Sequence, residues 1–241
     1  RRNPPKLFID EGALRMSLNH SPSIVTDGLV LCLDAANNRS YPGTGTACTD
    51  LANGKSGTLT NGPSFNSDNA GYFAFDGSDD YIQFNSVSST SEATVICWWR
   101  VENGITNTNA VRHRMWKIDS DYECRAARSD SQGSGKGSWT FDIGGGNTVY
   151  TSRRTWDANV WYSFALTHNY SENYLRIYTD GILTDSSTFG TNPNGLGSSL
   201  LIGGTSSDSM YGDIANFSIY NRALSAPEVL QNYEATVGRY T

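Results

Sequence analysis

The chain has 241 residues, a formal net charge of -6 and 17% charged residues, against roughly 25% in an average soluble protein. No long basic run accompanies this charge, which argues against a nucleic-acid phosphate track and equally against a directly held acidic polymer. No apolar stretch reaches the roughly 18 residues that a membrane helix needs. Gly, Ser, Thr and Asn are abundant and aromatic residues reach 12%, a profile typical of many short strands joined by polar turns.

The sequence divides into an N-terminal arm, residues 1–23, and one domain, residues 24–241. The arm contains Pro4, Pro5 and Pro22 and has little periodicity, so we expect it to be extended. Its positive charge is followed by no apolar segment, and it therefore does not predict an intact secretory signal. No internal repeat of fixed period appears, which disfavours propellers and solenoids.

Several segments of the domain have the pattern of strands. Residues 29–35 and 94–101 are apolar on both faces, which is typical of strands buried between layers. Other segments alternate between apolar and polar residues or carry the composition of short strands. These segments are residues 72–77, 80–84, 138–143, 161–170, 174–179, 200–204 and 214–220.

Two local motifs define the turns and the end of the domain. Asp180-Gly181 separates two alternating runs and predicts a two-residue hairpin turn with positive φ. Ser225 is followed three residues later by Glu228, which is the pattern of a capping box at the start of a helix.

The four cysteines, Cys32, Cys48, Cys97 and Cys124, are widely and irregularly spaced. No C-x-x-C pair is present, so a zinc ribbon or redox motif has no support. Cys32 and Cys97 lie in apolar runs and are most simply interpreted as buried free thiols. The even count leaves disulfides open as the alternative.

Three segments together carry a family resemblance. FDGSDDYI at residues 75–82, WYSFALTHNYSENYLRIYTDG at residues 161–181, and the closing strand and helix at residues 212–233 occur in family order. Over residues 24–235 the chain resembles the concanavalin A-like lectin/glucanase superfamily, specifically its laminin G-like jelly rolls. The resemblance implies an all-β fold: an antiparallel β-sandwich with one short C-terminal helix and the extended N-terminal arm.

The front of the domain carries a narrower resemblance. Residues 21–51 together with residues 57–65 look like the opening of laminin G-like modules in structural proteins of tailed bacteriophages, especially those of marine and cyanobacterial hosts. This resemblance implies a place on the surface of a virion, on capsid or tail. The arm from Arg1 to Ser23 would then attach the domain to other virion proteins, in many copies or as a homo-oligomer.

The superfamily that the chain resembles includes glucanases, so a catalytic carboxylate pair is a possibility for this chain. Retaining glucanases of this architecture carry Glu-x-Asp-x-x-Glu or a close variant on one strand, because alternate residues place both carboxyls on one face. The chain has no such run, and Asp121 with Glu123 is the nearest pair on one face, better interpreted as a solvated loop or edge-strand pair. His20, His113 and His168 are isolated, and for His168 we expect a capping or surface role. The sequence predicts no enzyme.

Calcium is the one cofactor that the residues raise. Asp76, Asp79 and Asp80 supply three carboxylates within five residues, and hard cations bind several oxygens from close turns. Relatives of this fold hold calcium near such loops. The alternative is that these Asp residues bond to backbone amides of their own turn.

Sugar binding requires an exposed aromatic platform with polar partners, because a pyranose has an apolar face and a ring of hydroxyls. Trp116, Tyr122 and Trp139 lie in the less regular middle of the chain and are the candidate platform. The first functional hypothesis is a non-enzymatic phage virion protein. The alternative is an adhesin that recognises host-surface glycans, and a glucan hydrolase has the least support.

Overall fold

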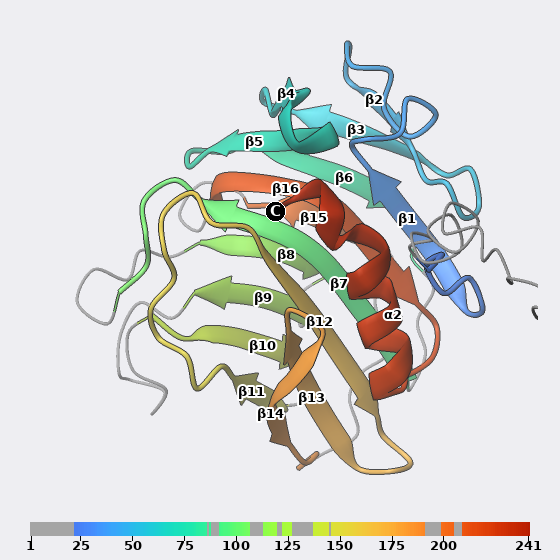
Figure 1. Ribbon diagram of the computed structural model, residues 1–241, viewed down its shortest axis with the longest axis vertical. Helices are drawn as coiled ribbons and strands as arrows, with labels where there is room; N and C mark the ends of the chain where they lie inside the picture. The colour runs from blue at the N-terminus through green and yellow to red at the C-terminus, as the bar shows by residue number, and fades with distance from the viewer. Residues whose placement is uncertain are drawn as a thin grey trace, which may run out of the picture.

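The computed structural model describes residues 22–85, 87, 92–106, 113–119, 122–126, 137–144, 146–190, 199–204 and 209–241. The predicted arm therefore lies almost wholly outside the described residues. The described chain forms two antiparallel sheets packed face to face as a sandwich, with one helix against the outer face of the first sheet (Figure 1). This confirms the predicted all-β sandwich with a short C-terminal helix.

The first sheet, sheet A, has the order β14-β13-β12-β7-β16-β5-β4, and β1 also pairs with β16. Its strands are β1 (Leu29–Asp34), β4 (Ser64–Asn66), β5 (Tyr72–Asp76), β7 (Glu92–Val101), β12 (Tyr162–Asn169), β13 (Tyr174–Thr179), β14 (Ile182–Ser187) and β16 (Tyr211–Tyr220). The long strand β16 pairs with β7 along one side and with β5 and then β1 along the other. The first and last strands of the domain thus meet at the centre of one sheet.

The second sheet, sheet B, has the order β11-β10-β9-β8-β15-β6-β3-β2. Its strands are β2 (Ala47–Thr49), β3 (Ser56–Thr60), β6 (Tyr81–Asn85), β8 (Arg114–Ile118), β9 (Tyr122–Ala126), β10 (Trp139–Ile143), β11 (Thr148–Tyr150) and β15 (Ser199–Gly203). Because β5 belongs to sheet A and β6 to sheet B, the short turn between them crosses from one layer to the other at the rim of the sandwich.

An aromatic cluster fills the space between the sheets. Trp99 of β7 packs against Trp139 of β10 at 4.7 Å and against Phe164 of β12 at 4.9 Å between ring centroids. Trp156 joins them, and all four rings are buried. Ring pairs at such separations add to the free energy gained from area burial. The alternation of β9, β10 and β12 therefore directs one set of side chains into a dry core.

The helix α2 (Ala226–Thr236) covers the outer face of sheet A. Trp98 stacks on Tyr233 and Tyr240, and its indole nitrogen donates to the Thr236 hydroxyl at 2.9 Å. The predicted capping box is confirmed, since the Ser225 N–H donates to the Glu228 carboxylate at 2.8 Å. Two further helical segments are short 3₁₀ turns, η1 (Asp68–Ala70) and η3 (Val237–Arg239).

The predicted hairpin turn is confirmed. Asp180 and Gly181 have φ of 52° and 77° and connect β13 to β14. All four cysteines are buried and free, as the interpretation of Cys32 and Cys97 required. Burial raises the pKa of Cys32 to about 11 and that of Cys48 to about 12, so these thiols are poor nucleophiles at neutral pH.

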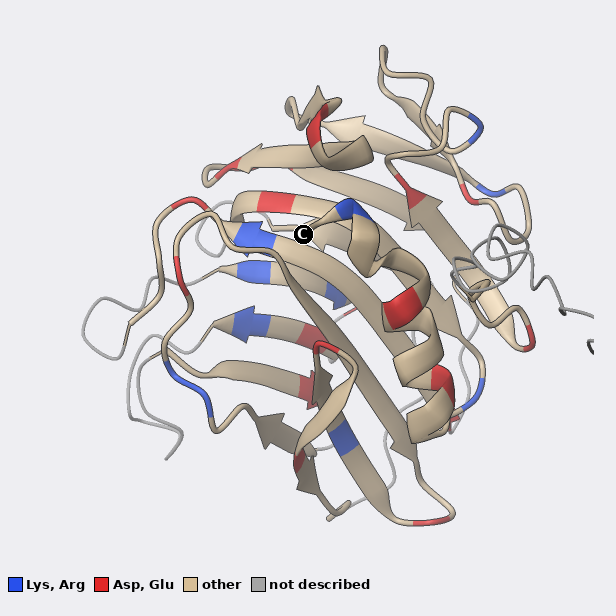
Figure 2. Cartoon of the chain, viewed as in Figure 1, with Lys and Arg blue, Asp and Glu red and all other residues tan. Residues whose placement is uncertain are grey.

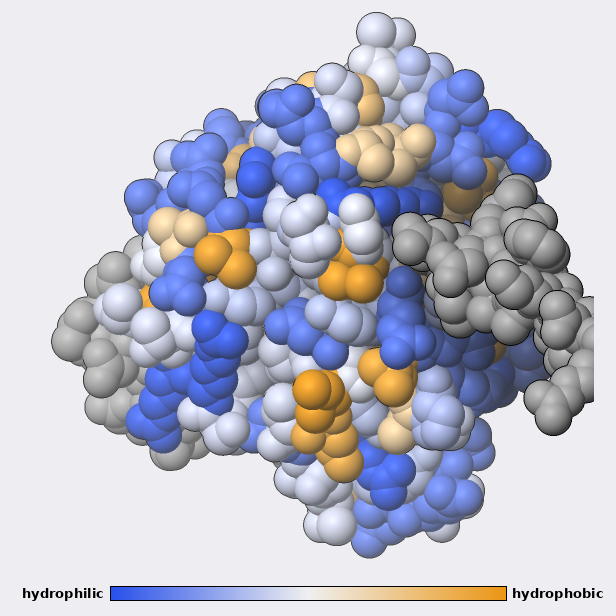
Figure 3. Space-filling view, in the orientation of Figure 1, coloured by the Kyte–Doolittle hydropathy of each residue, from blue (hydrophilic) through white to orange (hydrophobic). Residues whose placement is uncertain are grey.

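The face drawn in Figure 3 is mostly hydrophilic, with separate small orange groups in place of one continuous band. The large hydrophobic side chains that are exposed among the described residues are Val160, Tyr170, Ile182, Leu183 and Leu230. No helix in the described part of the chain has the length and apolar character needed to cross a membrane.

Candidate functional site

The turn between β5 and β6 brings the three predicted acidic residues together. Asp76, Asp79 and Asp80 each offer one carboxylate oxygen, and these three oxygens lie within 4.8 Å of one another. Asp76 and Asp79 are exposed, whereas Asp80 is buried, with 3% of its surface exposed. The proximity follows from the local chain, because a strand, a tight turn and a second strand hold five successive residues close.

Hydrogen bonds within the turn fix its shape. The Asp76 side chain accepts the Ser78 N–H at 2.7 Å, and one Asp80 oxygen accepts the Asp76 N–H at 3.0 Å. Gly77 has φ of +81°, and a β-carbon there would lie 3.0 Å from that of Tyr211. The alternative expectation, that these Asp residues bond to their own turn, is therefore met for Asp76 and for one oxygen of Asp80.

The second oxygen of Asp80, Oδ1, is buried with no hydrogen-bond partner among the described residues. Burial raises the pKa of Asp80, the charges of Asp76 and Asp79 raise it further, and the Asp76 N–H opposes both effects. A buried acceptor without a partner is costly, and a nearby cation would offset that cost. Three converging carboxylates with such an oxygen fit a hard, oxygen-binding cation such as calcium.

A hollow of about 390 Å³ adjoins the acidic turn. It is lined by Asp76, Gly77, Asn103, Gly104, Ile105, His113 and Tyr211. Asp76 and Tyr211 are direct neighbours across the β5–β16 ladder. Asn103 and Gly104 follow the end of β7, and His113 precedes β8. Four separate segments therefore meet at one end of the sandwich.

The polar groups of this hollow are held in defined states. His113 Nδ1 accepts the Tyr211 N–H at 3.1 Å, and burial lowers the His113 pKa to about 4, so the ring is neutral at physiological pH. The Tyr211 hydroxyl bonds to the Glu102 carboxylate, which raises the Tyr211 pKa. Figure 2 shows acidic residues at the end of β5 and in the loop after β7. The rim is therefore anionic and suits a cation.

The residues of this hollow other than Asp76 are not apparent from sequence reasoning. Tyr211, Asn103 and His113 are separated by many residues, and only the sheet order brings them together. One local signal exists. Gly212 follows Tyr211, and a β-carbon on Gly212 would lie 2.3 Å from the Arg100 carbonyl oxygen, so this glycine marks a close approach of β16 to β7.

The predicted sugar platform is wrong. Trp116, Tyr122 and Trp139 lie on β8, β9 and β10, and each is at most 1% exposed. Trp139 packs on Trp99, and the Tyr122 hydroxyl lies 2.8 Å from Nε2 of His168. These side chains point into the space between the sheets, so no face is left for a ligand. His168 is likewise buried, and the surface role expected for it is wrong.

Glu123, the carboxylate that comes nearest to the catalytic pattern of glucanases, is held in ion pairs. Glu123 lies on the outer face of β9 and forms ion pairs with Arg114 at 3.1 Å and with Arg125 at 3.0 Å. Its expected partner, Asp121, lies outside the described residues. Both carboxylate oxygens of Glu123 are thus engaged by guanidinium groups, and the side chain is held in a charge-paired cluster on the sheet surface.

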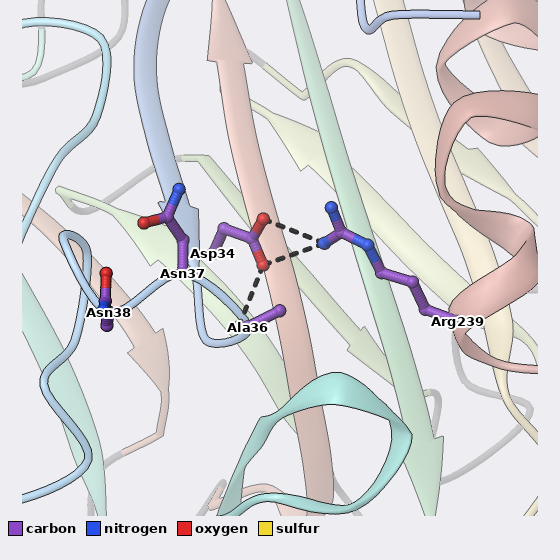
Figure 4. Close-up of a pocket in the computed structure, with 5 residues that line it drawn as sticks. All are labelled: Asp34, Ala36, Asn37, Asn38 and Arg239. Carbon is purple, nitrogen blue, oxygen red and sulfur yellow. Dashed lines mark hydrogen bonds and ion pairs between the residues drawn. The ribbon is translucent and has the colours of Figure 1, made fainter. Parts of the chain in front are cut away.

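A second hollow, of about 370 Å³, lies at the end of β1 and is lined by Asp34, Ala36, Asn37, Asn38 and Arg239. Figure 4 shows Arg239 reaching from the C-terminal segment to both oxygens of Asp34, at 2.9 and 3.1 Å. Asp34 also accepts the Ala36 N–H at 3.0 Å. The charged groups of this hollow satisfy one another, and the arrangement attaches the C-terminus to β1.

Comparison with protein families matches residues 76–230, more than half of the chain, to the laminin G type of the concanavalin A-like lectin/glucanases superfamily. The chain belongs to this superfamily. No curated protein sequence matches it.

Toxin binding domains are among the solved structures that this chain is similar to. A botulinum neurotoxin serotype D ligand binding domain in complex with N-acetylneuraminic acid has a TM-score of 0.66 and 16% identity over 88% of this chain and 52% of that one. A botulinum neurotoxin type G receptor binding domain has a TM-score of 0.61 and 17% identity, covering 86% and 51%. The chain spans about half of each, and at this identity the likeness supports the jelly-roll fold.

Proposed function

We propose that the chain is a non-enzymatic carbohydrate-binding jelly roll that holds its ligand at the acidic turn with the help of a calcium ion. The observation that carries the proposal is the hollow of about 390 Å³ that joins the Asp76 turn to Asn103 and Tyr211. This volume lies in the usual range of about 300 to 1,000 Å³ for small-ligand sites. It also combines an aromatic ring with amide and carboxylate groups.

Each group in the hollow has a separate role. Asp76, Asp79 and Asp80 would hold the ion, and its remaining oxygen ligands can come from water, backbone carbonyls and sugar hydroxyls. Asn103 offers an amide that can both donate and accept, while the Tyr211 ring offers an apolar edge. Neutral His113 accepts the backbone N–H of Tyr211 and so positions that residue. A bound calcium ion would supply positive charge that attracts hydroxyl or carboxylate oxygens of a glycan.

One observation supports binding over catalysis. Glu123, the carboxylate nearest to the glucanase pattern, is paired with two arginines through both of its oxygens. One similar structure is named as a complex with N-acetylneuraminic acid and another as a complex with SialylT. These names motivate the choice of sialylated glycans as the first probes.

The test is calorimetric titration of chelator-treated protein with calcium, followed by a glycan array with calcium and with EDTA. We expect calcium binding in the wild type and at least a roughly 100-fold loss in the Asp76→Asn/Asp79→Asn double variant, because two charged ligands are removed. The matched control is Asp68→Asn/Glu234→Gln, which changes the net charge equally at two exposed positions elsewhere. Absence of calcium heat in the wild type, or an equal loss in the control, would contradict the proposal.

A second proposal concerns the setting in which this module works. The sequence similarity of residues 21–51 to phage structural modules supports display on the surface of a tailed-phage virion, on capsid or tail, in many copies. Attachment would be through residues 1–23. Deletion of these residues should abolish incorporation into particles while leaving the unfolding transition of the domain in place. Unchanged incorporation would refute this attachment.

A further inference from the structure

A separate hollow of about 360 Å³ lies at the turn between β12 and β13. Tyr170, Ser171 and Asn173 of this turn line it together with Phe189 and Gly190, which follow β14. None of these residues belongs to the acidic site, and none was predicted from the sequence to be a binding residue.

The two hollows lie at opposite ends of the sandwich. Strands β7 and β12 are antiparallel, with Tyr162 opposite Trp99 and Asn169 opposite Glu92. Asn103 follows the end of β7, whereas Tyr170 follows the end of β12 (Figure 1). A ten-residue strand such as β7 spans roughly 33 Å at about 3.3 Å per residue. A ligand in one hollow therefore does not contact the other.

The aromatic part of this hollow is exposed and held in orientation. Tyr170 is 38% exposed, among the few large apolar side chains at the surface. Its ring meets the Phe189 ring edge to face, at 5.4 Å and 79°. Phe189 in turn meets the buried His168 ring at 6.2 Å and 74°. The ring of Tyr170 thus rests on a supported stack that continues into the core.

Side-chain amides tie the two segments of the hollow together. The Asn173 carbonyl oxygen accepts the Phe189 N–H at 2.8 Å, and the Asn147 carbonyl oxygen accepts the Gly190 N–H at 2.8 Å. Asn169 accepts the Glu172 N–H at 3.0 Å and the Ser171 hydroxyl at 2.7 Å. Such bonds order the rim before any ligand arrives, which lowers the entropy lost on binding.

The side-chain amide of Asn173, at the rim, has a bonded oxygen and an available NH₂ group. Asn173 is exposed and employs its oxygen within the structure, while no described residue accepts from its NH₂ group. A planar donor beside an exposed aromatic ring is the combination that pyranose recognition requires, because the sugar stacks its apolar face and bonds through its hydroxyls.

The charge around the hollow selects the ligand class. Among the described residues, those that line it include no basic side chain, and Glu172 lies in the same turn. An acidic sugar would meet a negative charge and no positive one. We infer that the Tyr170 hollow is a second carbohydrate site, independent of any cation, that takes an uncharged pyranose. This inference goes beyond the proposed function, because it concerns other residues and needs no calcium.

Saturation-transfer NMR on the full chain in EDTA tests the inference. The probes are methyl glycosides of glucose, galactose, mannose and N-acetylglucosamine, with N-acetylneuraminic acid as the charged comparison. We expect at least one uncharged glycoside to bind, and Tyr170→Ala to weaken it about tenfold through loss of stacking. Tyr211→Ala, at the acidic end, is the matched control and should leave this binding unchanged.

A second variant keeps the test independent of folding effects at Tyr170. Asn173→Asp retains an oxygen to accept the Phe189 N–H but removes the NH₂ donor, so we expect it to weaken binding as well. Absence of binding by every uncharged glycoside in EDTA would overturn the inference, as would a loss in Tyr211→Ala with none in Tyr170→Ala. Because EDTA removes calcium, this failure is distinguishable from failure of the proposed function, which the calcium titration decides.

Discussion

The acidic hollow beside β5 and the aromatic hollow beside β12 are both built where antiparallel strands turn, but they offer different chemistry. At the first, three carboxylates converge and one buried oxygen has no partner in the described structure. At the second, an exposed ring rests on a stack and the side-chain oxygens of the amides are bonded to backbone groups. The first leaves a buried acceptor that a cation would satisfy, whereas the second leaves a donor, the NH₂ group of Asn173. If both proposals hold, one scaffold carries an ion-dependent and an ion-independent mode of recognition.

Among the changes that distinguish the acidic end of the sandwich from the aromatic end, Gly203→Ala is expected to have the largest effect. Gly203 has φ of +88°, and a β-carbon there would lie 2.7 Å from both the Asp80 carbonyl oxygen and the Phe75 ring. We expect a loss of about 3 kcal/mol in the free energy of unfolding, from backbone strain and overpacking together. Urea unfolding measures it.

The control for that change is Gly54→Ala. Gly54 has φ of +70° with no atom within 4 Å of the added β-carbon, so only the conformational cost of about 1 kcal/mol applies. Equal losses in the two variants would show that the close contact with Asp80 does not matter. The aromatic end should retain its ligand in both variants while the chain is folded.

Acid titration should destabilise the fold through the acidic end. Burial lowers the pKa of His113 to about 4 from 6.5, so the unfolded chain takes up the proton first as the pH falls. The neutral His113 ring therefore contributes to the free energy of unfolding in full above pH 6.5. This contribution is lost between about pH 6.5 and 4, and the loss reaches up to about 3 kcal/mol. In His113→Asn, where an amide oxygen can replace Nδ1 as acceptor, this part of the pH dependence of urea unfolding should disappear. An unchanged pH profile would refute the assignment.

Added salt should affect ligand affinity differently at the two ends of the sandwich, and this difference is expected to be smaller than the preceding effects. Raising the salt from about 0.05 to about 0.5 M shortens the screening length from roughly 14 to roughly 4 Å. We expect calcium affinity at the Asp76 turn to fall several-fold in calorimetry, because exposed carboxylates attract the ion. Glycoside binding at the Tyr170 end should change little, and an equal fall at both ends would contradict the contrast drawn between them.

The smallest effect is expected from Tyr170→Phe. The ring and its contact with Phe189 are kept, and only the hydroxyl is removed. Affinity for the uncharged glycoside should change by at most about fivefold, since a typical hydrogen bond contributes only about 1 kcal/mol. A loss as large as that of Tyr170→Ala, measured by the same NMR titration, would show that the hydroxyl and not the ring face carries the binding.

Much of the fold could be predicted from the sequence because its signals are local. Apolar and polar patterns located several of the strands, Asp180-Gly181 located a hairpin, and Ser225 with Glu228 located the helix start. The proximity of Asp76 and Asp80 was predictable for the same reason. Strand β8, which carries Trp116, was not predicted, and alternation around Trp139 does not tell which face of its strand is inward, so these two buried rings could not be distinguished from exposed ones.

The rest of the site depends on topology. Tyr211 meets Asp76 because β16 lies next to β5, and no property of either segment alone specifies that neighbour. The Tyr170 hollow depends in the same way on the return of the chain after β14. The missed residues are thus those whose partners are remote in sequence, while the correct predictions involved residues within a few positions of one another.

The buried thiols have a further consequence. None of the four cysteines is cross-linked, so the fold is held by the packed interior, its hydrogen bonds and its ion pairs, without a disulfide. Its free energy of folding therefore does not depend on the redox potential of the surroundings. The unfolding transition is therefore expected to be the same with and without a reducing agent, and no oxidative step is needed to reach the fold.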